Sequence, residues 1–318
     1  MQTILVTGGC GFIGSHCVVE LLQNNYNVII VDNLINSSIH VLDAIEKITN
    51  KKPLFYQYDI TSHKLNDVFK NHPIDAVIHL AGYKSVSESF TDPLLYYDNN
   101  VCGLINLLKC MNKFKVNKII FSSSATVYGQ PDIVPVTESS PIQILNPYGQ
   151  TKYMSELILK DLKITSIIFR YFNPVGGHPL LGEKPNGIPT NLFPVILSVY
   201  NQKQSHLNIF GSDYNTSDGT AIRDYIHVID LAKAHVQALD YDQSDIFNLG
   251  TGQGYTVLDI VKTFEKQTNQ KCPYQLKERR MGDADIIYAD YTKAKQLLKW
   301  EPIYDLETMV KDTIKANF

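Results

Sequence analysis

The first half of the chain alternates short, continuous apolar runs with longer amphipathic stretches. The apolar runs cover residues 4–7, 28–32, 54–59, 76–81, 119–123 and 166–171. Runs of this length without alternating polar positions are typical of strands buried on both faces of a parallel sheet. The stretches between them that show helical spacing cover residues 13–24, 38–49, 92–112 and 148–163. The pattern predicts an α/β fold with a doubly wound, Rossmann-like parallel sheet.

This rhythm changes after about residue 173. Glycine and proline crowd residues 174–194, and such residues favour irregular loops in place of regular elements. We therefore expect residues 1–173 to form the Rossmann-like domain, to which later segments can still add strands. Residues 174–318 are expected to form mainly a smaller carboxy-terminal substrate lobe.

The composition excludes several classes of protein. The 318 residues are 44% hydrophobic and 19% charged, and the net charge of -3 provides no basic field for a nucleic acid. The amino terminus enters an apolar strand without a signal peptide, and no run approaches the roughly 18 apolar residues of a membrane span. The five cysteines lack the paired spacing of disulfides or zinc sites. We expect a cytoplasmic protein with reduced thiols and with no metal, membrane or nucleic-acid partner.

A glycine-rich turn joins the first predicted strand to the first predicted helix. Gly8, Gly11 and Gly14 have the spacing that allows a tight turn, a close approach to a pyrophosphate, and packing of helix on strand. Asp32 ends the second strand, where a carboxylate accepts hydrogen bonds from the adenine ribose and repels a 2′-phosphate. The alternatives are a turn that merely reverses the chain and an aspartate in a surface turn. The combination favours NAD as cofactor over NADP.

Tyr148 and Lys152 are four residues apart at the start of a predicted helix, so both side chains emerge on one face. A neighbouring ammonium and a positive nicotinamide ring would both lower the pKa of a tyrosine and make it a better base. Ser124 ends the fifth predicted strand, where ligand sites of open α/β sheets gather. A Tyr-x-x-x-Lys spacing alone is common on solvated helices, but its position after the glycine-rich turn favours catalysis.

Several segments together resemble the extended short-chain dehydrogenase/reductase family, and nearly the whole chain resembles its branch that epimerises UDP-sugars at C4. The segments that carry the resemblance are residues 7–14, 32–34, 79–84, 96–101, 122–129, 147–152, 170–176, 223–228 and 279–283. The resemblance implies an NAD-dependent isomerase of galactose metabolism that interconverts UDP-glucose and UDP-galactose through a 4-keto intermediate. It also implies a homodimer formed through the helices at 92–112 and 148–163, although apolar residues at helical spacing fit a core equally well.

The resemblance assigns residues to each ligand. It places the cofactor against Gly8, Gly11, Phe12, Ile13, Gly14, Asp32, Asn33, Asn36, Ser37, Asp59, Ile60, Leu80, Ala81, Lys84, Asn99, Ser122, Tyr148, Lys152 and Tyr171. It places the UDP-sugar against Lys84, Ser124, Tyr148, Asn173, Asn191, Leu192, Asn208, Phe210, Arg223, Arg280 and Asp283. Arginines suit this role because they bind a diphosphate through paired hydrogen bonds, and Asp283 can accept from ribose hydroxyls.

Other activities stay open at this point. A sugar-nucleotide 4,6-dehydratase has the same cofactor site but carries Asp-Glu where this chain has Ala125 and Thr126, so elimination lacks a proton carrier. A non-catalytic NAD-binding protein would not need Ser124, Tyr148 and Lys152 together. Ile287 matches the family position that limits room for an N-acetyl group, so 4-epimerisation of another UDP-sugar, such as UDP-N-acetylglucosamine, is the main alternative.

Overall fold

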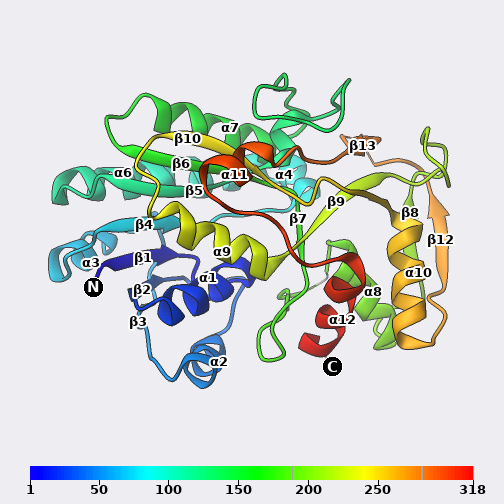
Figure 1. Cartoon of the computed structure of the whole chain (residues 1–318), viewed down its shortest axis with the longest axis horizontal. Coiled ribbons are helices and arrows are strands. Elements are labelled where there is room, and N and C mark those ends of the chain that lie inside the picture. Colours follow the sequence, from blue (N-terminus) through cyan, green and yellow to red (C-terminus); the bar gives the residue numbers. More distant parts are fainter. Residues whose placement is uncertain (188, 281, 318) are drawn as a thin grey trace.

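A seven-stranded parallel sheet forms the centre of the larger lobe (Figure 1). The computed structural model describes residues 1–187, 189–280 and 282–317; Met281 of the predicted ligand segment 279–283 lies outside them. The strands run in the order β10 (Asp245–Leu249), β6 (Thr165–Tyr171), β5 (Lys118–Ser124), β4 (Ala76–His79), β1 (Thr3–Thr7), β2 (Asn27–Val31) and β3 (Leu54–Tyr56). The predicted doubly wound α/β fold is confirmed.

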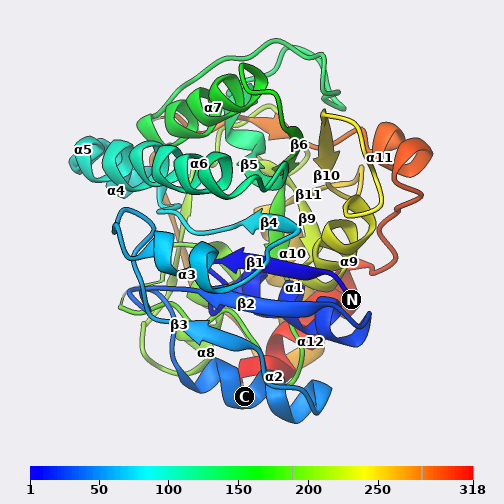
Figure 2. The ribbon, with the colours of Figure 1, turned by 90° about the vertical axis from the view of Figure 1, so that its left-hand side faces the viewer.

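Helices cover both faces of this sheet, which explains its continuous apolar strands. One face is covered by α1 (Phe12–Gln23), α2 (His40–Thr49) and α9 (Val228–Ala238), and the other by α3 (Leu65–Asn71), α6 (Gly103–Phe114) and α7 (Pro147–Lys160) (Figure 2). Along β1, Ile4 and Val6 pack into the first helix layer, and Leu5 packs into the second. Successive side chains point to opposite faces, so both sets of side chains along β1 are buried against apolar residues.

The helix predicted over residues 92–112 is not continuous. It consists of α5 (Pro93–Tyr96), a π-helical segment η1 (Tyr97–Cys102) and α6. The change of winding keeps the apolar spacing nearly intact, so the hydrophobic pattern does not reveal it. Within residues 1–173, three short helices lie outside the predicted stretches, namely α3, α4 (Val86–Thr91) and the 3₁₀ turn η2 (Ala125–Tyr128).

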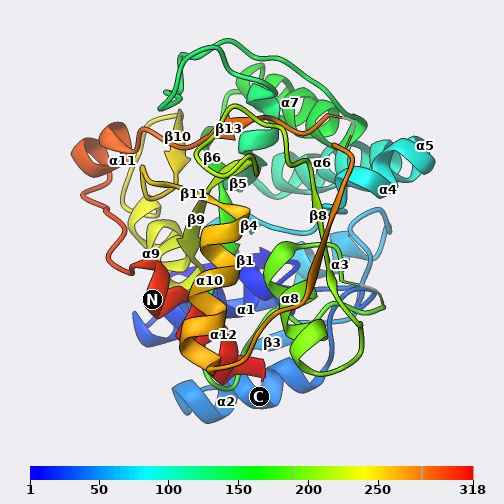
Figure 3. The same ribbon diagram turned by 90° about the vertical axis from the view of Figure 1, so that its right-hand side faces the viewer.

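The second lobe is more regular than its glycine and proline content suggests. It contains β7 (Asn173–Val175), α8 (Leu192–Tyr200), β8 (Leu207–Phe210), β9 (Ile222–His227), β11 (Gly254–Thr256), α10 (Val257–Thr268), β12 (Tyr274–Lys277), β13 (Ile286–Ile287) and α12 (Leu306–Asn317) (Figure 3). The expectation of irregular loops is wrong beyond residue 191. Phe193, Phe264 and Met309 share a buried core there, and this packing stabilises regular elements.

The chain returns to the larger lobe after building part of the second. The β10 strand pairs in parallel with β6, α9 packs against α1, and α11 (Thr292–Leu297) packs against β10. Among the described residues, no helix is both long and apolar enough to cross a membrane.

Candidate active site

The glycine-rich turn between β1 and α1 leaves no room for a side chain at Gly8 or Gly14. Gly8 has φ +71°, and a Cβ there would lie 2.7 Å from the backbone nitrogen of Ala81. A Cβ on Gly14 would lie 2.1 Å from the carbonyl oxygen of Gly8. The turn therefore brings the backbone and the free N–H groups that begin α1 to the pocket surface, which is the arrangement that binds a pyrophosphate.

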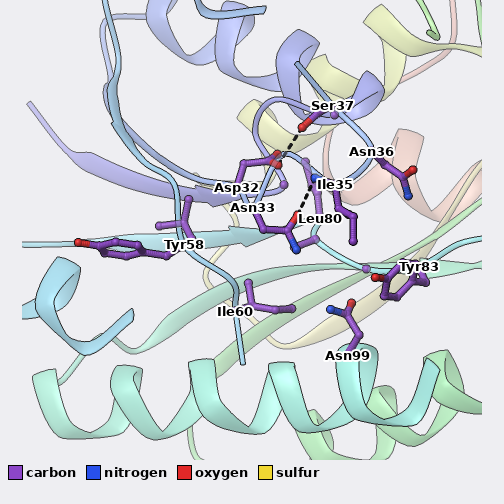
Figure 4. A pocket seen from close by; sticks show the side chains of 15 residues that line it. Asp32, Asn33, Ile35, Asn36, Ser37, Tyr58, Ile60, Leu80, Tyr83 and Asn99 are labelled. Carbon is purple, nitrogen blue, oxygen red and sulfur yellow. Dashed lines mark hydrogen bonds between the residues drawn. The ribbon is translucent and has the colours of Figure 1, made fainter. Parts of the chain in front are cut away.

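The Asp32 carboxylate connects this turn to the loop that follows β2. Its Oδ2 accepts a hydrogen bond from the Cys10 backbone N–H at 3.0 Å, and its Oδ1 accepts from the Leu34 backbone N–H at 2.8 Å. Oδ1 also accepts from the Ser37 hydroxyl at 2.9 Å (Figure 4). Asp32 and Ser37 both line a pocket at the carboxyl end of the sheet. The bare glycine backbone beside a fixed carboxylate fits the pyrophosphate and ribose of a dinucleotide.

Ten of the nineteen predicted cofactor residues line that pocket. They are Gly8, Gly11, Asp32, Asn33, Asn36, Ser37, Ile60, Leu80, Ala81 and Asn99. Five lining residues were missed from the sequence, namely Val31, Ile35, Tyr58, Gly82 and Tyr83. Tyr58 and Tyr83 each immediately precede a predicted cofactor-binding residue, Asp59 or Lys84. That adjacency was the sequence signal that could have identified them.

The remaining predicted cofactor residues lie outside the lining of that pocket. Phe12, Ile13 and Gly14 begin α1, and Asp59 accepts a hydrogen bond from Asn33 Nδ2 at 2.7 Å beside the pocket. Tyr171 ends β6, is 6% exposed, and donates its hydroxyl to His235 Nε2 at 2.5 Å. Lys84, Ser122, Tyr148 and Lys152 belong to the neighbouring groups described next.

The π-helical segment η1 connects the pocket to α7. Asn99 lines the pocket, and the next residue, Asn100, is 4% exposed. The Asn100 amide accepts from the Tyr83 N–H at 2.8 Å and donates to the Tyr83 carbonyl at 3.0 Å and the Thr151 hydroxyl at 3.1 Å. The π-helical segment, a type of turn that often marks functional sites, thus contacts Thr151, the residue next to Lys152.

Ser124, Tyr148 and Lys152 come together at the carboxyl ends of the central strands. Ser124 ends β5, and α7 begins at Pro147 with Asn146 as its cap, whose Oδ1 accepts from the Gly149 N–H at 2.8 Å. Lys152 Nζ donates to the Ser122 carbonyl at 2.7 Å and lies 5.8 Å from the centre of the Tyr148 ring. The structure thus brings the predicted catalytic residues into one group.

Burial controls the protonation of this group. It lowers the pKa of Lys152 to about 8, an effect that the nearby Glu156 carboxylate opposes. It raises the pKa of Tyr148 to about 12, against the effect of the Ser124 hydroxyl. The expected lowering of the tyrosine pKa is thus not seen in the protein alone, because loss of water outweighs the effect of the Ser124 hydroxyl.

A buried ion pair fixes α7 on the sheet. Arg170 on β6 donates from Nε and Nη2 to the two carboxylate oxygens of Glu156 at 3.0 Å and 2.7 Å, and both side chains are almost fully buried. The Ser123 hydroxyl adds a hydrogen bond to Glu156 at 2.5 Å, and the Tyr128 hydroxyl accepts from Arg170 at 2.9 Å. Because Glu156 lies one turn beyond Lys152, these contacts hold the helix that carries the lysine.

The predicted UDP-sugar residues fall into separate clusters. In the second lobe, the Arg280 guanidinium lies 3.8 Å from the centre of the Phe210 ring, and Arg223 Nη2 lies 3.8 Å from Asp283 Oδ1. Asn208 is exposed on β8, Asn173 begins β7, and Leu192 begins α8. Asn191 instead joins Lys84: both donate to Glu183 Oε1, at 2.7 Å and 2.6 Å. Glu183 was missed from the sequence, since nothing in its local motif indicates a partner 99 residues away.

This fold and site define an enzyme of the extended short-chain dehydrogenase/reductase class. The family model described as GDP-mannose 4,6 dehydratase matches residues 5–313. The chain is 49% identical to the UDP-glucose 4-epimerase of Bacillus subtilis over 98% of this chain and 96% of the relative, and 51% identical to that of Pasteurella multocida with the same coverage. The chain belongs to the UDP-glucose 4-epimerase family.

Solved structures agree with this assignment. A UDP-glucose 4-epimerase from Bifidobacterium longum, in complex with NAD+ and UDP, superposes with a TM-score of 0.97 at 45% identity over 99% of this chain and 98% of that one. An enzyme from Stenotrophomonas maltophila with bound NAD and formylated UDP-arabinopyranose superposes with a TM-score of 0.96 at 43% identity, over 100% of this chain and 98% of that one.

Proposed function

We propose that this chain is an NAD-dependent isomerase that interconverts UDP-glucose and UDP-galactose by transient oxidation at C4 of the sugar. The observation that mainly supports this proposal is the grouping of Ser124, Tyr148 and Lys152 at the carboxyl end of the sheet. It occurs in a chain about half identical, over nearly its whole length, to UDP-glucose 4-epimerases. A dehydratase is disfavoured because Ala125 and Thr126 provide no acid for elimination.

In this proposal the residues of the chain move protons and hold the substrate. Bound NAD supplies the acceptor, and later the donor, of the C4 hydride. Tyr148 removes the proton from the 4-hydroxyl, and Ser124 hydrogen-bonds to the same hydroxyl. The Tyr148 pKa of about 12 has to fall for this step, and the Lys152 ammonium and the positive nicotinamide ring both favour the phenolate.

The second lobe would hold UDP while the sugar turns. Arg223 and Arg280 pair with the diphosphate, and Asp283 accepts from the uridine ribose. Because these contacts are remote from C4, they keep the 4-keto sugar bound while it presents its other face to the hydride. Inversion therefore needs tight binding of UDP and a looser sugar pocket.

The test is turnover of UDP-galactose by purified protein without added NAD, with products separated by chromatography. UDP-glucose is the expected product. The Tyr148→Phe variant is expected to lose activity by at least about a hundredfold, the lower end of a general-base contribution. The matched control is Tyr274→Phe, on β12 with 45% of its surface exposed. Activity of Tyr148→Phe within a fewfold of the unmodified protein would refute the role of Tyr148.

We also propose a homodimer located in the cytoplasm. The α5 and α7 helices pack together and leave Leu94 78% exposed and Leu157 42% exposed, and burial of such side chains favours association. All five cysteines are free, which suits a reducing compartment. Light scattering should give twice the chain mass, and Leu157→Glu should reduce it to the mass of one chain. A monomeric unmodified protein would refute the dimer.

A further inference from the structure

A strap formed by residues 177–187 crosses between the two lobes; it is part of the green segment that runs from β7 past α12 in Figure 1. Its base is fixed on α12. A Cβ on Gly182 would lie 2.9 Å from the Ala316 carbonyl oxygen, and the N–H of Gly176, just before the strap, donates to the Thr313 hydroxyl at 3.0 Å. Leu181 is 4% exposed and packs into the core of the larger lobe. The base of the strap is therefore held on both sides.

The strap contacts an element beyond three of the strand ends that border the cofactor pocket, namely those of β1, β2 and β4. Beyond β1, the His178 N–H donates to His16 Nε2 on α1 at 3.1 Å. Beyond β2, Asn186 Nδ2 donates to the Ile35 carbonyl oxygen at 3.0 Å. Beyond β4, Lys84 Nζ donates to Glu183 at 2.6 Å. Ile35 lines the pocket, so these contacts tie the pocket rim to α12 in the second lobe.

Glu183 has the strongest of these contacts. Its side chain is only 11% exposed, although that of Lys84 is 60% exposed. The same oxygen, Oε1, accepts from Lys84 and from Asn191 at the start of α8. One carboxylate oxygen thus connects the loop after β4 to the first turn of α8. A charged hydrogen bond with one partner in each lobe resists separation of the two elements.

We propose that the strap retains the dinucleotide, with Glu183 as the positioning residue that fastens it. This inference rests on the proposed function, in which the cofactor stays bound through two opposite hydride transfers. A dinucleotide leaves this pocket when the loops after β2 and β4 move apart. The strap opposes that movement because Asn186 holds the first loop and Glu183 holds the second.

The experiment measures exchange of bound NAD. Purified protein is loaded with radiolabelled NAD, an excess of unlabelled NAD is added, and the protein-bound label is followed with time. Glu183→Gln keeps the shape of the side chain and removes its charge. It is expected to speed label loss by about fivefold, the order of effect that a partly exposed ion pair supports. Asn186→Ala, which removes an exposed contact, is expected to accelerate loss as well.

Glu307→Gln is the matched control, because it removes an exposed 2.6 Å ion pair with Lys266 between α10 and α12. It should leave the exchange rate unchanged. The thermal unfolding midpoint is measured for each variant. General destabilisation would lower the midpoint by a similar amount in control and test variants, so this measurement separates it from a specific effect on exchange.

The outcomes are distinguishable. If the purified protein neither contains NAD nor takes it up, the proposed function fails and the strap proposal fails with it. If NAD loads but both strap variants exchange it within twofold of the unmodified rate, the strap proposal alone is overturned. Faster exchange in both variants, with an unchanged control, supports retention by the strap.

Discussion

Replacement of Lys152 by methionine should stabilise the fold near neutral pH. Lys152 is 6% exposed, and burial lowers its pKa to about 8 from the ordinary value of 10.5. The folded protein therefore holds this ammonium at an energetic cost, which the unfolded chain does not bear because its lysine is in water. Methionine keeps the apolar stem and has no charge to bury.

The size of the effect follows from the two pKa values. The difference between 10.5 and about 8 corresponds to about 3 kcal/mol. Between pH 8 and 10.5 the unfolded state binds more protons than the folded state, so the lysine protein gains stability as pH rises through this range. Below pH 8 both states are protonated, and the full cost is present. Lys152→Met should thus be more stable at pH 7, with the difference shrinking as the pH approaches 10.5.

Urea denaturation of NAD-free protein at pH 7.0, 8.5 and 10.0 tests this reasoning. NAD must be absent because a bound ligand stabilises the folded state by mass action. The loss of the hydrogen bond to Ser122 shifts all three values together, so the informative quantity is the change of the difference with pH. The Lys160→Met control removes an exposed lysine at the end of the same helix and should show little such change. A pH-independent difference for Lys152→Met would refute a buried, destabilised ammonium.

Three further changes follow from the site. Glu156→Gln leaves Arg170 buried without its charged partner and should lower the free energy of unfolding by about 3–5 kcal/mol in urea denaturation; a loss below about 1 kcal/mol would contradict the importance of the pair. Gly14→Ala places a Cβ 2.1 Å from the Gly8 carbonyl oxygen and should abolish NAD binding, measured as NAD released by heat denaturation; full NAD content would show that the turn adapts. Ile287, 7% exposed on β13, should limit the size of the sugar pocket. Its replacement by tyrosine should reduce turnover of UDP-N-acetylgalactosamine relative to UDP-galactose by about tenfold. An equal effect on both substrates would show that Ile287 does not control specificity.

The sheet of the larger lobe was predictable because each strand is indicated by a pattern of residues that are neighbours in the sequence. A strand buried on both faces must be apolar at every position, and Ile4, Leu5 and Val6 meet that requirement with two different helix layers. The assignment of residues 245–249 to the same sheet was not predictable. Pairing of this segment with β6 depends on contacts between residues 78 positions apart, as at Phe247 and Phe169, and no local pattern records them.

The same distinction applies to the site. The glycine-rich turn, Asp32 and the Tyr148–Lys152 pair form short motifs whose spacing carries the chemistry, so the sequence was sufficient to propose them. Glu183 was missed because its relevance depends on where distant segments meet. The sequence also could not show that burial raises the pKa of Tyr148, because that shift depends on how completely water is excluded.

The late return of β10 has a consequence for synthesis of the chain on the ribosome. When residues 1–173 have emerged, β6 is the outermost strand on its side of the sheet, and its backbone groups on that side still lack their partner strand. They remain open to other nascent chains until residues 245–249 arrive. A chain truncated before Leu249 would thus expose an unpaired, aggregation-prone strand edge. It would be a substrate for chaperones and proteases rather than an independent nucleotide-binding fragment.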